Sequence, residues 1–208
     1  MKKILVATAF GALLLSSSIG AFAADGKAYV GASAGLFMLE DSKLTNNGGT
    51  ATGSFDTGYT VSGAVGYAFG NGLRLEGEIS RRGADFDKIA ERGFADVKVD
   101  SEVHATSFMA NAFFDIKSQS IVTPYFGGGI GISNVGIGRG KVQGTTVWDS
   151  DDDTVFAYQV GAGVGFDLTK NVTLDLGYRY FATEKAKFEF TDAEVASHNV
   201  TVGVRYLF

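Results

Sequence analysis

The chain has 208 residues, with 29 glycines, one proline, no cysteine and a formal net charge of −5. Glycine is present at about twice its usual share of roughly 7%, but the lack of a Gly-X-Y period and of proline excludes collagen and Pro-rich disorder. A hydrophobic content of 45% also excludes an intrinsically disordered chain. The missing cysteines exclude disulfides and thiolate zinc sites. The acidic balance argues against a nucleic-acid-binding surface.

The N-terminal segment has the order of a secretory signal peptide. Two lysines, Lys2 and Lys3, precede an uncharged run from Ile4 to Leu15, and small residues follow up to Ala23. This run is shorter than the ~20 apolar residues of a membrane-spanning helix. We therefore predict a signal peptide over residues 1–23 and a mature domain over residues 24–208, which indicates export.

The mature chain alternates between apolar residues and small or polar residues with a period of two, which is typical of strands and not of helices. In chain order the predicted strands are Ala28–Met38, Tyr59–Phe69, Leu73–Ile79, Phe108–Ile116, Tyr125–Ser133, Tyr158–Phe166, Val172–Phe181 and His198–Phe208. These are about eight strands, and an even number is what bacterial outer-membrane barrels have.

Alternation alone does not exclude a soluble barrel, whose apolar side faces inward, but the connections and the small-residue face favour a membrane barrel. Glycine, alanine, serine and threonine dominate the less apolar face, and such residues suit the crowded lumen of an eight-stranded barrel. Short and long connections also alternate, as they do in transmembrane barrels. The short ones are Asn71-Gly72, 118–120 and 169–171, and the long ones are 41–57, 84–100, 139–153 and 186–196.

Aromatic residues gather near both ends of the predicted strands. On the short-turn side they are Tyr67, Phe69, Phe114, Phe166, Tyr206 and Phe208, and on the long-loop side they are Tyr59, Phe108, Phe156, Tyr158 and Tyr180. Two such girdles mark the two interfaces of a membrane barrel. The predicted fold is therefore all-β: an eight-stranded antiparallel transmembrane up-and-down β-barrel in the bacterial outer membrane, after an N-terminal signal peptide.

Several charged residues fall on the face predicted to line the lumen. They are Arg74, Glu76, Glu78, Asp115, Asp167, Asp175, Arg179 and Arg205. Charges removed from water are costly unless they are paired, so we expect a polar network of arginines and carboxylates. This network is interpreted as a structural plug, with an ion path or gate as the alternative.

The third long loop carries Trp148, Asp149, Asp151, Asp152 and Asp153, which are candidates for contact with a ligand. Its opening imitates a calcium loop, but Thr154 and Val160 stand where such a loop has glycine and glutamate. We therefore expect a solvated acidic loop and no dedicated metal site. Trp148 is interpreted either as a contact anchor or as part of the outer aromatic girdle.

The two histidines do not form an evident catalytic site. A triad of the kind found in barrel lipid A deacylases needs serine and an acid beside histidine. His104 is followed two places on by Thr106, and neither His104 nor His198 has an evident acidic partner by spacing. We expect no enzyme, no cofactor and no metal.

Three segments together resemble the opacity family of outer-membrane proteins, to which neisserial surface protein A also belongs. They are Val122-Thr-Pro-Tyr-Phe-Gly-Gly-Gly-Ile-Gly, the run from Val164 to Tyr180, and the closing Val200-Thr-Val-Gly-Val-Arg-Tyr-Leu-Phe208. The resemblance implies an eight-stranded barrel whose extracellular loops contact host proteins. It also implies that Tyr206 and Phe208 belong to a signal read by the outer-membrane assembly machinery.

The sequence thus favours a surface protein whose four loops act in adhesion or in contact with host or other ligands. The alternatives are a narrow porin-like channel and a structural protein that supports the outer membrane. The expected partners are outer-membrane lipid and lipopolysaccharide, the assembly machinery and host surface or serum proteins, without nucleic acid.

Overall fold

A computed structural model shows a barrel whose wall is made of long antiparallel strands. The residues described are 26–40, 42–46, 49–55, 57–90, 97–98, 102–117, 120–138, 140–142, 145–148, 150–187, 192–193 and 195–208. Within them the wall strands are β1 (Lys27–Leu39), β4 (Gly58–Ala68), β5 (Leu73–Ala90), β7 (Glu102–Asp115), β8 (Val122–Ile137), β11 (Asp151–Asp167), β12 (Val172–Thr183) and β15 (Ala196–Leu207).

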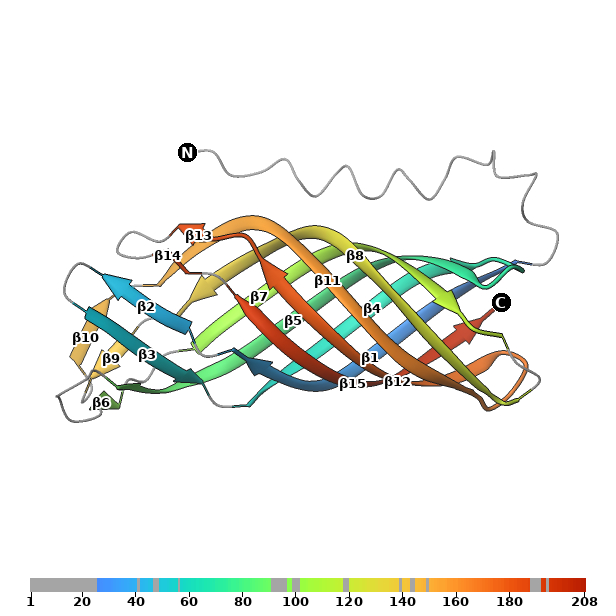
Figure 1. The fold of residues 1–208 in the computed structure, drawn as a ribbon, viewed down its shortest axis with the longest axis horizontal. Coiled ribbons are helices and arrows are strands. Elements are labelled where there is room, and N and C mark those ends of the chain that lie inside the picture. The colour runs from blue at the N-terminus through green and yellow to red at the C-terminus, as the bar shows by residue number, and fades with distance from the viewer. Residues whose placement is uncertain are drawn as a thin grey trace.

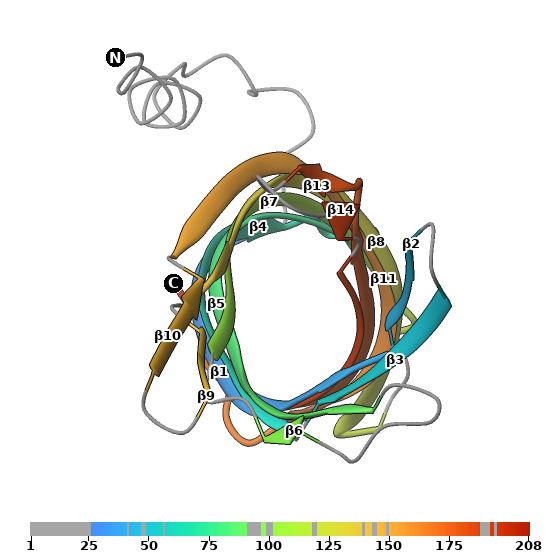
Figure 2. The ribbon, with the colours of Figure 1, turned by 90° about the vertical axis from the view of Figure 1, so that its left-hand side faces the viewer.

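These eight strands close into a ring, as predicted. Each pairs with the next one, and β15 returns to pair with β1 through the register Gly31↔Arg205. Figure 2 shows the closed ring in a view along the barrel. Closure leaves no wall strand with a free edge, so the backbone of a lipid-embedded wall can be paired internally.

No helix in the described part of the chain is long and apolar enough to cross a membrane.

Short strands project from one end of the barrel (Figure 1), where the sequence predicts only loops. They are β2 (Ser42–Asn46), β3 (Gly49–Phe55), β6 (Val97–Lys98), β9 (Gly140–Val142), β10 (Thr145–Trp148), β13 (Ala186–Lys187) and β14 (Asp192–Ala193). The hairpin β2–β3 pairs with the far end of β5, through Thr52↔Ala90 and Phe55↔Phe86. Several long connections are therefore partly extensions of the wall, because pairing satisfies backbone groups that a bare loop would leave to water.

Tight turns close the opposite end, near the C-terminus (Figure 1). In the first turn Gly72 has a φ of +96°, a conformation that residues with a Cβ rarely adopt. The Asn71 side chain accepts a hydrogen bond of 3.0 Å from the Leu73 amide. Asn71-Gly72 thus turns the chain between β4 and β5 without a loop, as the sequence predicts.

The apolar side chains of the wall face outward. Leu36, Ile79, Phe108, Ile130, Val160 and Val202 are each between 43% and 60% exposed. Aromatic side chains pair on this surface near the tight turns: Tyr67 contacts Phe69 and Tyr206 contacts Phe208, with ring centroids 4.9 and 5.3 Å apart. The outer surface therefore has the apolar band and aromatic residues expected where a barrel faces lipid.

Small residues let large side chains fill the lumen. A Cβ on Gly163 would lie 2.5 Å from the hydroxyl of Tyr125, and one on Gly129 would collide with the Asn111 amide. Toward the loop end the lumen is apolar, with a buried cluster of Phe37, Ala84, Ala105, Met109, Val135, Ala157, Phe181 and Val195. The glycine excess is therefore partly a packing requirement of a narrow barrel.

Candidate functional site: the lumen and the loop-side rim

In the part of the lumen nearest the tight turns, Arg74 lies between a carboxylate and aromatic rings. Arg74 on β5 donates from Nε to both carboxylate oxygens of Asp115 on β7, at 2.8 and 2.9 Å. Its guanidinium also lies 5.0 Å from the ring centroids of Phe113 and Tyr125. Alternation along β5 and β7 turns both charges inward, and the strand pairing Arg74↔Phe113 brings them to adjacent positions.

A second ion pair lies on the opposite side of the ring, between β12 and β15. Arg205 on β15 donates from Nε and Nη2 to Asp175 on β12, at 2.5 and 2.9 Å. Asp167, another residue predicted for the network, is exposed at the end of β11 and accepts a hydrogen bond of 2.6 Å from the Thr173 hydroxyl. Within the described contacts Asp167 has no arginine partner, and the nearby Arg205 bonds Asp175.

The centre of the lumen holds the two buried glutamates. Glu76 accepts hydrogen bonds from Tyr29 at 2.9 Å and from Asn111 at 3.2 Å. Glu78 forms an ion pair with Arg179, which reaches it from β12. These bonds connect strands on different sides of the ring. Side chains therefore occupy the space that water would fill in an open pore.

Arg82 is the main lumen residue that the sequence analysis did not single out. Its guanidinium donates to Ser80 at 2.9 Å and to Ser107 at 3.2 Å, and it lies 4.0 Å from the centroid of the Phe181 ring. The alternation that turns Arg74 and Glu78 inward continues along β5 to Arg82. Extending that period by two more steps would have found it.

Little space remains beside this network. A polar cavity of about 40 Å³ is lined by Arg74, Glu78, Arg179 and Arg205, among others. That volume holds a few water molecules, and it is far from an aqueous channel. The geometry therefore fits a packed polar interior better than an open ion path.

The acidic residues of the third long connection lie partly in a strand. Asp151, Asp152 and Asp153 begin β11 and pair with the end of β8, and the Asp152 carboxylate accepts a hydrogen bond of 3.0 Å from Asn134. Asp149 lies outside the described residues, and Trp148 is described only as part of the backbone of β10. Neighbouring residues of a strand point to opposite faces, so the three carboxylates do not converge as in a calcium loop.

His198 has partners that its sequence position does not reveal. Its Nε2 lies 3.0 Å from a carboxylate oxygen of Glu40, and its Nδ1 lies 2.6 Å from the Tyr178 hydroxyl. Glu40 is 158 residues away in sequence and comes close only because β15 pairs with β1. Spacing in the sequence does not reveal this acidic partner, and the group contains a phenol where a triad would have serine.

Among the described residues no group of three or more histidine, aspartate or glutamate side chains is arranged to hold a metal ion.

The profile of the family described as "Outer membrane protein beta-barrel domain" matches residues 9–208. The chain belongs to this family and is an integral β-barrel of the bacterial outer membrane.

Relatives agree with this assignment. The chain is 25% identical to outer membrane protein PagN of Salmonella typhimurium, over 70% of this chain and 71% of that protein. It is 26% identical to a putative adhesin of Rickettsia prowazekii over 99% of both chains. It is also 25% identical to opacity protein opA60 of Neisseria gonorrhoeae, over 70% of this chain and 76% of that one, which confirms the resemblance to the opacity family.

Among solved structures, neisserial surface protein A is similar, with a TM-score of 0.58 and 24% identity over 87% of this chain and 97% of that one. This likeness supports the fold of the barrel. The relatives are outer-membrane proteins and adhesins rather than enzymes, in agreement with the expectation of no enzymatic activity.

Proposed function

We propose that this protein acts at the cell surface, through the strands and connections at the loop end of the barrel, by binding a host or environmental ligand. The observation that carries the proposal is the contrast between the two ends. One end closes in tight turns such as Asn71-Gly72, whereas the other extends the wall into hairpins (Figure 1). Loops and extensions on a rigid scaffold are where binding residues concentrate.

Two further findings support this proposal. The packed polar lumen leaves little room for transport, as the cavity beside Arg74 and Arg179 illustrates. The Rickettsia relative is named a putative adhesin and aligns with almost the whole chain. Trp148 and the acidic run from Asp149 to Asp153 remain the candidate contact residues.

The test expresses the full chain in a non-adherent laboratory strain and measures attachment of whole cells to cultured epithelial cells. We expect attachment above that of empty-vector cells, and a loss of at least half of it when residues 139–149 are replaced by a short Gly-Ser turn. Lys170→Gln, in a tight turn at the opposite end, is the control and should attach like wild type. Attachment equal to empty vector, or unchanged after replacement of each of the four long connections, would contradict the proposal.

The C-terminal strand supports a second part of the proposal, binding to the assembly machinery during insertion. Tyr206 and Phe208 are exposed, at 47% and 66%, and lie at the end of β15. Aromatic side chains that are exposed at this end of β15 are accessible to a partner before the barrel closes.

A further inference from the structure

The outer face of β5, β7, β8 and β11 changes from apolar to polar within one step along the strands. Ile79, Phe108, Ile132 and Phe156 pair across these four strands and form one row of the outer surface. The next outward-facing row toward the loop end, here called the polar row, consists of Arg81, Thr106, Asn134 and Thr154. Such a sharp boundary marks the outer edge of the apolar band, where headgroups begin.

Arg81 is the cation of the polar row. It is exposed, and its Nη1 donates a weak hydrogen bond of 3.4 Å to the Thr106 hydroxyl. In the described part of the chain it forms no ion pair, unlike Arg74, Arg179 and Arg205 in the lumen. An arginine at this depth directs its guanidinium toward the headgroups, and guanidinium groups bind phosphate oxygens in bidentate fashion.

On β5 and β7 neither the polar row nor the next outward row contains a carboxylate, and the acidic pair Asp85 and Glu102 follows one outward row further toward the loop end. His104 lies on the next outward row beside Gly83, and the ring of Tyr59 lies close to Gly83, 3.0 Å from where a Cβ would be. The nearest described carboxylate of the two rows is Asp152, on β11 at the far end, where it is bonded to Asn134. Charge along the two rows therefore runs from positive on β5 to negative on β11.

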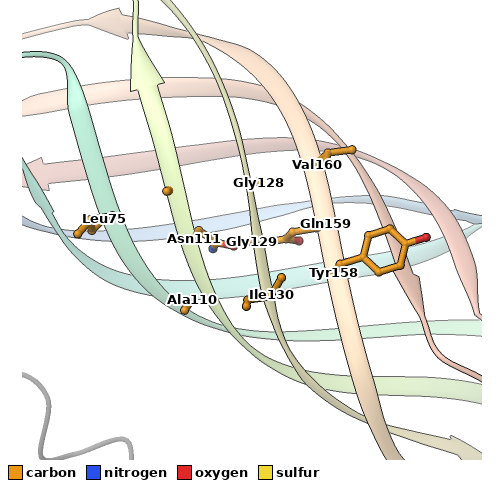
Figure 3. A pocket seen from close by; sticks show the side chains of 10 residues that line it. Leu75, Ala110, Asn111, Gly128, Gly129, Ile130, Tyr158, Gln159 and Val160 are labelled. Atoms are coloured by element: carbon orange, nitrogen blue, oxygen red, sulfur yellow. Dashed lines mark hydrogen bonds between the residues drawn. The ribbon is translucent and has the colours of Figure 1, made fainter.

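A shallow apolar hollow of about 540 Å³ lies on the same four strands, nearer the tight turns. The hollow is lined by small residues of β7 and β8 together with larger residues of β5, β8 and β11, as Figure 3 shows. The outward residues are Leu75, Ala110, Ala112, Gly128, Ile130, Tyr158 and Val160. In a membrane, a hollow in the apolar band of a barrel faces the acyl chains of the surrounding lipid.

We propose that one phosphorylated glycolipid of the outer leaflet binds this face. Its phosphate lies on Arg81 and Thr106, and one of its acyl chains lies in the hollow beside Ala112 and Gly128. The order along the strands, from cation and hydroxyl to apolar row to hollow, matches the order of phosphate and acyl chain in an amphipathic lipid. This site lies on the wall, and it does not depend on ligand binding by the loop end.

The test measures binding of three probes to the purified full chain in detergent micelles by native mass spectrometry. The probes are diphosphoryl lipid A, phosphatidylglycerol and inorganic phosphate. We expect lipid A to bind most tightly. Its affinity should fall about tenfold in Arg81→Gln, because a charge-assisted hydrogen bond is lost. Ala112→Leu, which fills the hollow from an exposed position, should also weaken it.

Lys170→Gln removes one positive charge far from this face and should bind lipid A like wild type. Folding of every variant is checked by its heat-dependent migration on gels, and Arg81→Lys should keep part of the affinity if the fold is intact. Unchanged lipid A binding in Arg81→Gln would overturn the phosphate position, and unchanged binding in Ala112→Leu would overturn the acyl position. Equal affinity for phosphatidylglycerol, or equal binding of inorganic phosphate, would overturn the assignment to a glycolipid.

Discussion

The ion pair of Glu78 and Arg179 stabilises the barrel from inside its lumen. Glu78 is 1% exposed and Arg179 18% exposed, and they come from strands β5 and β12, 101 residues apart in sequence. Glu78 has a further polar partner, since Gln159 donates to it at 3.4 Å. Removal of one partner leaves the other charge inside the lumen without its counter-ion, which is costlier than removal of both.

We therefore predict that Glu78→Ala and Arg179→Ala each lower the free energy of unfolding by about 3–5 kcal/mol. The double variant should lose less than the sum of the two, by about 0.5–3 kcal/mol. Urea unfolding in lipid vesicles measures these values. Glu184→Ala, at an exposed position just beyond β12, is the control and should change stability by less than about 0.5 kcal/mol. Additive losses would show that the two charges do not stabilise each other.

For single residues, the sequence predicts which face of a strand a side chain lies on but not which side chains it contacts. The period of two places Arg74, Glu78 and Arg179 on the inward face, and in the structure each of them has an oppositely charged partner. It could not show that Asp167 lies at the rim with Thr173, or that Glu40 and Tyr178 flank His198. Alternation determines the face of a residue, whereas its partners depend on which strands are neighbours and in which register.

At the scale of elements, the hairpins differ in how they attach to the wall. The β2–β3 hairpin pairs with the end of β5 as far as Ala90. In the described part of the chain, β9 and β10 pair only with each other. The β2–β3 hairpin therefore continues the barrel sheet, whereas β9 and β10 form a separate two-stranded sheet.

We predict that replacing residues 42–55 by a short turn raises amide hydrogen exchange of residues 86–90, because their pairing partners are lost. Replacing residues 139–149 should leave exchange of 86–90 unchanged. Exchange measured on the refolded protein by mass spectrometry distinguishes the two. Equal protection of residues 86–90 in both variants would show that β5 is stable there without β3.

The strand ends show where the sequence signal weakens. The strand predicted over Phe108–Ile116 runs from Glu102 to Asp115, and the one predicted over Tyr125–Ser133 runs from Val122 to Ile137. Beyond the apolar band both faces of a strand are polar, so alternation no longer distinguishes strand from loop. The segments outside lipid were therefore predicted as loops.

The whole molecule is a closed wall around a filled interior. Arg179–Glu78 bridges the lumen, Arg74–Asp115 and Arg205–Asp175 line it between neighbouring strands, and an apolar cluster lies toward the loop end. Eight strands leave an interior that side chains can fill, whereas 16-stranded porins enclose water. The filled lumen therefore argues against the alternative of a narrow porin-like channel.

We predict that the full chain in planar bilayers shows no steady conductance, and that Glu76→Ala leaves it closed, because Tyr29, Arg74 and Asn111 still occupy that level of the lumen. A 16-stranded porin recorded in the same bilayers is the positive control. A steady current that appears in Glu76→Ala would instead identify the network as a gate.

The sequence by itself determined the class of fold, the faces of the strands and the end of the barrel that carries the long connections. These follow from local rules, because the period of a strand and the residues of a tight turn such as Asn71-Gly72 act within a few positions. Only the tertiary structure decided which inward charges meet, that β2–β3 extends β5, and that Arg81 lies above an apolar hollow. Closure of the ring fixes the stagger between strands, and that stagger brings distant side chains such as Glu78 and Arg179 together.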